Sequence, residues 1–265
     1  MDILFIGDIV GRPGRKAVKG VLNDLKSNYK IDFVIANGEN AAGGTGLTKK
    51  VAIELFNMGI DCLTMGNHVW DKKEIFDFIN EEHRIVRPGN YPEGTPGCGS
   101  TILLKNNKKI GIINVSGRVF MDTLDCPFKT VERELINIKK QTNIIIVDFH
   151  AEATSEKVAM AWFLDGKVTA VLGTHTHVQT ADERILPHGT AYITDVGMTG
   201  PYNSVLGIKA DLVLKKFITQ LPVSFKLAAG DKIFNGVVLN IDDKTGKARK
   251  IKRINLLVKS DEGKE

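Results

Sequence analysis

The stretch Asp2–Gly11, DILFIGDIVG, decides the fold. Its apolar run ends at Gly7, and the carboxylate of Asp8 follows at once. Short apolar runs of this kind favour buried strands. Residues 13–25 then show helical periodicity, with Pro13 near the first turn, where its fixed φ suits the start of a helix. A strand that ends in glycine and passes into a helix indicates an α/β protein.

The same pattern recurs along the rest of the chain. Thr48 is placed to cap a helix that Gly59 ends, and Asp71 and Glu74 have the spacing of a capping box. Asn106-Asn107 lies between two apolar runs and predicts an antiparallel hairpin. Further strands are predicted at residues 32–36, 62–65, 101–104, 110–115, 144–149, 168–172, 191–194, 223–227, 237–241 and 250–258, and further helices begin near residues 48, 71, 130, 155 and 210.

Composition and length exclude several protein classes. With 265 residues, 43% of them hydrophobic and 25% charged, the chain is neither disordered nor collagen-like, and it can bury a large core. No repeat or linker interrupts it, so we expect a single domain over residues 1–265, with a polar tail at 257–265. No apolar run approaches the roughly 20 residues that cross a bilayer, and no signal peptide is visible. Cys62, Cys98 and Cys126 are scattered, without CxxC spacing, which favours free thiols and a cytoplasmic location.

The net charge of +5 is too small to imply a nucleic-acid partner, although it favours anionic substrates. Residues 244–253 are rich in lysine and arginine and could bind RNA. However, the alternation Lys250-Ile251-Lys252 is typical of a solvated edge strand, where lysine discourages aggregation. We therefore expect no stable binding of nucleic acid and no membrane contact.

Side chains that can bind metals follow the predicted strands. An open α/β sheet places its ligand at the carboxyl ends of the strands, so these side chains should meet. Carboxylate, amide and imidazole together suit Mn, Fe, Zn or Ni better than Ca or Mg. In His175-x-His177 an extended backbone would aim both imidazoles to one side. The residues at these strand ends are Asp8, Glu39, Asn40, Asn67, His68, His150, His175 and His177.

These side chains exceed the needs of one ion. Two ions about 3.5 to 4 Å apart, bridged by a carboxylate, would use them. The sequence therefore predicts a site for two transition-metal ions per chain.

An ordered set of motifs resembles the calcineurin-like metallophosphoesterases, and within them most closely the YmdB-like bacterial phosphodiesterases. Val10 replaces the histidine of the usual DxH motif, and NGEN replaces the usual GDxxD, departures that fit this branch. The resemblance implies a four-layer αββα fold, a sandwich of two sheets flanked by helices. The motifs are GDIVG (7–11), NGEN (37–40), GNH (66–68), DFHAE (148–152) and GTHTH (173–177), together with GRPGR (11–15), AAGGTG (41–46) and DVGMTGP (195–201).

The resemblance also implies roles for single residues. One metal would be held by Asp8, Glu39, Asn40 and His177, and the second by Glu39, Asn67, His150 and His175. Glu39 would bridge the two ions, with Fe or Mn favoured and Zn, Ni or Mg as alternatives. A metal-bridging hydroxide would attack phosphorus, and His68 would donate a proton to the leaving oxygen.

The expected substrate is a cyclic nucleotide. Two divalent ions with two carboxylates and a hydroxide leave about one positive charge, which a phosphodiester monoanion balances. The resemblance points to 2',3'-cyclic nucleotides, with 3',5'-cyclic ones as a second option, and to a homo-oligomer. Substrate contacts are expected at Arg12, Gly43, Gly44 and Thr45, which lie in glycine-rich loops.

Three other functions fit parts of the sequence. A metal-dependent phosphomonoesterase would use the same ligands. A regulatory module could bind cyclic nucleotides with little turnover, although a free His68 favours catalysis. A ureohydrolase shares the DxHxD-like stretch at Asp148, but the chain has no SxDxD string and the His175-x-His177 pair would be unexplained.

Overall fold

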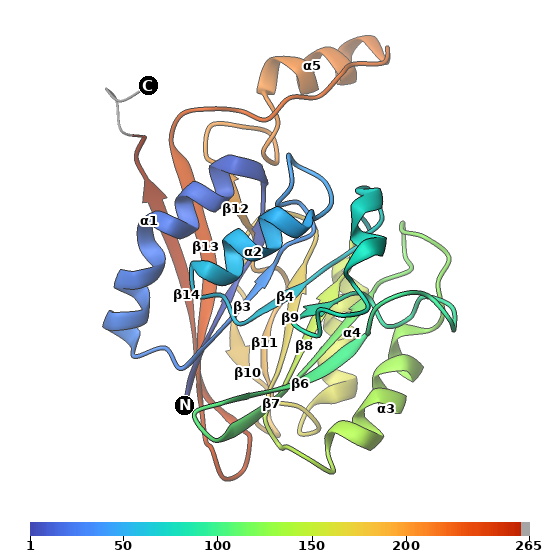
Figure 1. The fold of residues 1–265 in the computed structure, drawn as a ribbon, viewed down its shortest axis with the longest axis vertical. Coiled ribbons are helices and arrows are strands. Elements are labelled where there is room, and N and C mark those ends of the chain that lie inside the picture. Colours follow the sequence, from blue (N-terminus) through green and yellow to red (C-terminus); the bar gives the residue numbers. More distant parts are fainter. Residues whose placement is uncertain (261–265) are drawn as a thin grey trace.

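In the computed structural model, which describes residues 1–260, two β-sheets pack face to face with helices on both outer surfaces (Figure 1). The predicted αββα sandwich is confirmed. That residues 1–265 form a single domain stays a prediction.

The first sheet contains the N-terminal strands. β1 pairs in parallel with β3 on one side and antiparallel with β13 on the other. The order is β2-β12-β13-β1-β3-β4-β5, with β14 paired to β13 as an edge strand. The strands are β1 (Asp2–Ile6), β2 (Asp8–Ile9), β3 (Phe33–Asn37), β4 (Cys62–Thr64), β5 (Ile85–Val86), β12 (Met198–Pro201), β13 (Lys232–Ile241) and β14 (Ala248–Val258).

The second sheet has the order β10-β11-β9-β8-β7-β6. Strands β7, β8, β9 and β11 run parallel, whereas β6 and β7 form the predicted hairpin, with Asn106 and Asn107 at φ 50° and 61° in its turn. Its strands are β6 (Ser100–Lys105), β7 (Lys108–Ser116), β8 (Ile145–His150), β9 (Ala170–Thr174), β10 (Arg184–Ile185) and β11 (Ala191–Ile193).

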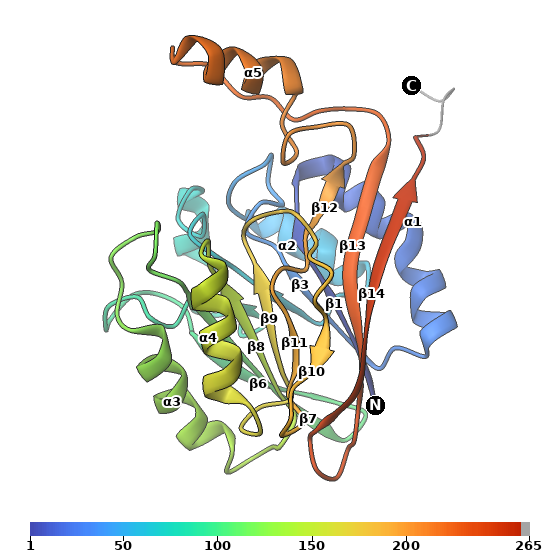
Figure 2. The same ribbon diagram turned by 180° about the vertical axis from the view of Figure 1, so that it is seen from behind.

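Alternate side chains of each strand point to opposite faces of its sheet, and this arrangement forms the layers. Ile3 and Phe5 of β1 pack into the core between the sheets, whereas Leu4 and Ile6 belong to the core beneath the outer helices. In β8, Ile146 faces the first sheet, and its neighbours pack with α3 and α4. Helices α1 (Gly11–Tyr29) and α2 (Lys49–Asn57) cover one outer face, and α3 (Pro127–Ile138) and α4 (Thr154–Leu164) cover the other (Figure 2).

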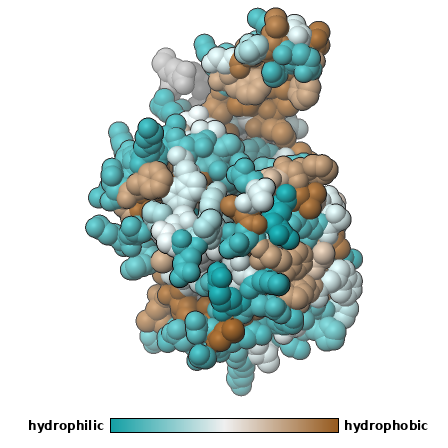
Figure 3. Space-filling view, turned by 90° about the vertical axis from the view of Figure 1, so that its right-hand side faces the viewer, coloured by the Kyte–Doolittle hydropathy of each residue, from teal (hydrophilic) through white to brown (hydrophobic). Residues whose placement is uncertain are grey.

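Helix α5 (Ala210–Thr219) projects above the sheets, at the end where the strand carboxyl ends lie (Figures 1 and 2). Phe217 and Ile218 on this helix are 70% and 79% exposed, and apolar surface gathers on this projection (Figure 3). None of the helices within residues 1–260 has the length and apolar character needed to cross a membrane.

Three local predictions are wrong. The capping box at Asp71 does not form, because Glu74 accepts a hydrogen bond from the Lys49 backbone instead, and only a short 3-10 helix, η1 (Lys73–Asp77), follows. The predicted strand 223–227 has no ladder beyond one bridge between Leu227 and Ile208, because its residues pair with neither sheet. The predicted polar tail begins too early, because β14 continues to Val258, and residues 261–265 lie outside the described part.

Other local predictions hold. Thr48 caps α2 by accepting a hydrogen bond from the Val51 backbone, and Gly59 follows that helix at φ 99°. The Lys250–Lys252 alternation lies on the edge strand β14, as expected. Arg249 and Arg253 of this basic segment form ion pairs with Asp242 and Glu183, each at 2.7 Å.

Candidate metal centre

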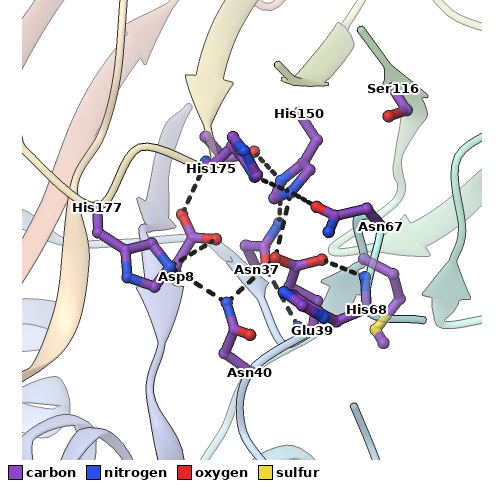
Figure 4. A network of polar contacts seen from close by, with 12 residues as sticks. Asp8, Asn37, Glu39, Asn40, Asn67, His68, Ser116, His150, His175 and His177 are labelled. Atoms are coloured by element: carbon purple, nitrogen blue, oxygen red, sulfur yellow. Dashed lines mark hydrogen bonds and ion pairs between the residues drawn. The ribbon is translucent and has the colours of Figure 1, made fainter. Parts of the chain in front are cut away.

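The carboxyl ends of five strands, three from the first sheet and two from the second, meet at one edge of the sandwich (Figure 4). Parallel pairing of β1, β3 and β4 and of β8 and β9 explains this, because parallel neighbours end on the same side. The structure brings together all the residues predicted to hold metal: Asp8, Glu39, Asn40, Asn67, His150, His175 and His177.

One group of side chains consists of Asp8, Asn40 and His177. The Nε2 atom of His177 lies 3.2 Å from Nδ2 of Asn40 and 3.8 Å from Oδ1 of Asp8. The other ring nitrogen of His177, Nδ1, donates to the carbonyl of Leu206 at 3.2 Å. This bond fixes the ring so that Nε2 faces the group, as metal-binding histidines require.

A second group consists of Asn67, His150 and His175. Nε2 of His150 lies 3.0 Å from both Oδ1 of Asn67 and Nδ1 of His175. Burial is the main cause that lowers the pKa of His175, and the neighbouring His150 adds to this, so that the pKa falls to about 3. His175 is therefore neutral at pH 7, as a metal ligand must be.

Glu39 lies between the two groups. Its Oε1 atom is 3.1 Å from Nε2 of His150 and 3.1 Å from Nδ2 of Asn40. Burial raises the pKa of Glu39, but the charge and hydrogen bond of His150 outweigh it and lower the pKa to about 2. Burial lowers the pKa of His150, but the charge and hydrogen bond of Glu39 outweigh it and raise that pKa to about 9, so a cation bound at His150 would have to displace the ring proton. The carboxylate of Glu39 is thus ionised and touches both groups.

The residues present fit bound cations. Asp8 is fully buried, and its Oδ1 atom has no hydrogen-bond partner among the described residues, whereas Oδ2 accepts from the His175 backbone. Burial raises the pKa of Asp8, and the nearby His177 and His150 offset this only in part. Donor atoms of Glu39, His150 and His175 also lie within 4.8 Å of one another. A buried carboxylate oxygen without a hydrogen-bond partner, placed among nitrogen and oxygen donors, suits a bound cation.

His68 stands apart from both groups. Its backbone N–H donates to Oε2 of Glu39 at 3.1 Å, but its ring turns to Asp71, with Nδ1 2.9 Å from Oδ2. The side chain is 37% exposed, so part of the ring is open to solvent. The ring is thus turned towards Asp71, and the role of His68 as a proton donor rather than a metal ligand stays a prediction.

The expected extended backbone of His175-x-His177 is wrong. Strand β9 ends at Thr174, and His175 and His177 have φ values of 103° and 67°. Their rings consequently face different groups, His150 for the one and Asp8 for the other. Both still reach the site, but through a strained turn that the period of a strand does not predict.

The loops predicted to contact substrate lie beside Asn40. The carbonyl of Asn40 accepts from the backbones of Gly11 and Gly44, at 2.9 and 3.2 Å. Arg12 is exposed next to Gly11, and a Cβ atom on Gly43 would meet nothing within 4 Å. The loop around Gly43 is thus open, and whether it binds substrate stays a prediction.

Sequence reasoning missed the buried residues behind the histidines. Nδ1 of His150 donates to the hydroxyl of Thr174, which in turn donates to Asp148 at 2.7 Å. Asp148 also accepts from Asn37, and burial raises its pKa to about 6. The only signal was their position, since Asp148 and Thr174 stand inside the motifs DFHAE and GTHTH.

Comparison with known proteins identifies the family. A model of the family described as YmdB-like protein matches residues 4–254. The chain belongs to the YmdB-like family. A Bacillus subtilis (strain 168) relative named 2',3'-cyclic-nucleotide 2'-phosphodiesterase is 56% identical over 254 residues, which cover 96% of each chain.

Two solved structures resemble this one closely. A crystal structure of a protein from Thermus thermophilus has a TM-score of 0.91 at 43% identity and covers 97% of this chain and 100% of its own. A phosphatase from Mycoplasma pneumoniae has a TM-score of 0.92 at 37% identity, covering 98% and 95%. The predicted family and fold are confirmed, as is the prediction of a hydrolase that acts on phosphoric ester bonds.

Proposed function

We propose that this YmdB-like protein is a dinuclear metal-dependent phosphodiesterase that hydrolyses 2',3'-cyclic nucleotides, with 3',5'-cyclic nucleotides as a second option. The position of Glu39 carries the proposal, because its carboxylate touches both groups of candidate ligands. A bridging carboxylate is what two neighbouring ions need. The name of the Bacillus subtilis relative supports the choice of substrate.

The proposed ligands divide as the two groups do. Asp8, Asn40 and His177 would hold one ion, Asn67, His150 and His175 the other, and Glu39 both. When bound, such ions lower the pKa of water towards neutrality and stabilise charge on phosphate oxygens. Fe or Mn suits this mixed set of nitrogen and oxygen donors, with Zn, Ni or Mg as alternatives.

His68 would protonate the leaving oxygen. Asp71 accepts the proton of Nδ1, so the ring can present an Nε2 proton to a substrate at the exposed side of the site. Arg12, Gly43, Gly44 and Thr45 would contact the substrate from the loops tied to Asn40.

Two further proposals concern the oligomeric state and the location of the protein. A homo-oligomer is proposed from the family resemblance, and light scattering on the purified protein tests it. A cytoplasmic location is proposed from the three free cysteines, Cys62, Cys98 and Cys126, which no disulfide joins in the structure of residues 1–260.

The test combines metal analysis with a substrate panel. Protein purified without chelator should contain more than one transition metal per chain. It should cleave 2',3'-cyclic nucleotides and bis(p-nitrophenyl) phosphate faster than p-nitrophenyl phosphate. A stoichiometry that reconstitution cannot raise above one would refute the dinuclear site, and a preference for the monoester would favour a phosphomonoesterase. Binding of cyclic nucleotide without single-turnover cleavage would favour a regulatory module.

A further inference from the structure

A buried ion pair lies next to the candidate metal centre and takes no part in it. Nζ of Lys157, on α4, is 2.7 Å from Oδ2 of Asp195, which follows β11, and both side chains are 1% exposed. Burying two charges costs free energy that their attraction seldom recovers in full. A contribution to stability therefore does not explain why this ion pair is buried here.

Asp195 is bonded to the turn that carries two candidate ligands. Its Oδ2 atom accepts from the backbone N–H of Thr176 at 3.1 Å and from the Thr176 hydroxyl at 2.8 Å. Its Oδ1 atom accepts from the Gly197 backbone at 2.8 Å. Together with Lys157, these donors bond both oxygens of the carboxylate, and this fixes its position.

Thr176 is the residue between His175 and His177, both of which have positive φ. A backbone in this region persists only where its surroundings hold it. The two hydrogen bonds that Thr176 donates to Asp195, one from its backbone and one from its hydroxyl, restrain this backbone.

The segment that follows Asp195 also forms backbone hydrogen bonds with residues of the candidate metal centre. The carbonyl of Gly197 accepts from the backbone of Asp8 at 3.0 Å, and the backbone of Met198 donates to the carbonyl of His177 at 3.1 Å. Asp8 and His177 belong to one group of candidate ligands. The DVGMTGP motif thus ties that group to the Lys157–Asp195 pair.

We infer that the Lys157–Asp195 ion pair is a positioning device, which acts through Thr176 to hold His175 and His177 in the strained turn that binds metal. The inference rests on the proposed metal site. Lys157 neutralises the buried carboxylate, Asp195 fixes Thr176, and Thr176 holds the backbone from which both imidazoles project. None of the three is a proposed metal ligand or a proposed substrate contact.

The test measures metal affinity rather than activity. Thr176→Val keeps the shape of the side chain but removes its hydroxyl bond to Asp195. In calorimetric titrations of chelator-treated protein with Mn²⁺, we expect binding to weaken by about 10 to 100-fold, as for other residues that orient metal ligands. Thr176→Ser restores the hydroxyl and should restore most of the affinity.

Thr169→Val is the matched control. Thr169 is a buried threonine whose hydroxyl bonds to the Gly246 carbonyl and the Ile145 backbone, at the amino ends of the strands. It should lower thermal stability while Mn²⁺ affinity stays within about twofold of wild type, because it lies outside the shell of groups that orient metal ligands. Lys157→Met should lower both stability and affinity, because it leaves Asp195 buried without its cation.

Each outcome decides a separate question. If Thr176→Val binds Mn²⁺ as tightly as wild type, or Thr176→Ser is as weak as Thr176→Val, the inference is overturned. If Lys157→Met loses stability but not affinity, the ion pair is only structural, which also overturns it. If the wild-type protein itself binds no Mn²⁺ or other transition metal, the proposed function fails instead.

Discussion

At the scale of single residues, the division of labour among the histidines is open to experiment. His68 is the motif histidine whose ring faces Asp71 rather than the other candidate ligands. His68→Ala should therefore retain metal, while kcat on a 2',3'-cyclic nucleotide falls about 10² to 10⁴-fold, the usual value of general acid catalysis. The loss should be smaller on bis(p-nitrophenyl) phosphate, because nitrophenolate leaves without a proton.

His188→Ala is a matched control for this variant. His188 is also an exposed histidine whose Nδ1 atom lies 2.9 Å from an aspartate, Asp165, but it lies in the turn before β11, among residues that do not belong to the site. Its kcat should equal that of wild type. Loss of metal from His68→Ala, measured by elemental analysis, would make His68 a ligand. Equal defects on both substrates would indicate positioning instead of proton donation.

Glu39 and Asp8 should differ when each carboxylate is removed. Glu39 touches both groups of candidate ligands, whereas Asp8 faces only His177 and the His175 backbone. Glu39→Ala should lower the metal content of both sites, and Asp8→Ala mainly that of one. Metal-to-protein ratios after reconstitution measure this. Equal partial losses in the two variants would contradict a bridging Glu39.

At the scale of elements, the sequence predicts strands better than it predicts what lies between them. β1 and β8 are apolar runs with a polar residue at or just after the end, so both the strand and the side chain it presents can be read directly. The strand predicted at 223–227 failed because its apolar residues do not pair with a sheet, and pairing is a long-range property.

The supporting contacts of the site could not be predicted for the same reason. Lys157 and Asp195 are 38 residues apart, and no local pattern marks them as partners. The positive φ values of His175 and His177 are uncommon for histidine, and no local pattern in the sequence indicates them. The motifs thus predicted which residues could bind metal, whereas the directions of their side chains became visible only in the folded structure.

The substitution Gly173→Ala tests whether the close packing of β9 is needed to position His175 and His177. A Cβ atom at this position would lie 1.8 Å from the carbonyl oxygen of Thr194, so the backbone of β9 or of the segment after β11 must move. Gly173→Ala should cost about 1 to 3 kcal/mol of unfolding free energy, as overpacking does, and should weaken metal binding. Urea denaturation and metal titration measure the two effects.

For Gly20→Ala we expect the opposite effect on the free energy of unfolding. Gly20 lies on the exposed side of α1 with ordinary helical φ, and a Cβ there would make only ordinary contact with Val258. Alanine should stabilise the helix by about 0.4 to 1 kcal/mol. If Gly173→Ala were as stable as Gly20→Ala, the close approach of Gly173 to Thr194 would not constrain the site.

At the scale of the whole molecule, the candidate metal centre joins the two sheets. Asp8, Glu39 and Asn40 come from the first sheet, whereas His150, His175 and His177 come from the second. Metal bound between them would link the layers of the sandwich. Within residues 1–260, Oδ1 of the buried Asp8 carboxylate has no hydrogen-bond partner, a cost to folding that a bound cation would offset.

Metal removal should therefore lower the stability of the whole protein. A ligand that binds only the folded state adds about 2.7 kcal/mol when its free concentration is about 100 times its dissociation constant. Thermal melts with EDTA and with added Mn²⁺ should differ by several degrees, and the difference should grow with Mn²⁺ concentration. Glu39→Ala, which lacks the proposed bridge, should show little of this response. A wild-type melting temperature that does not change while EDTA removes the metal would show that the ions bind at a place that does not couple the two sheets.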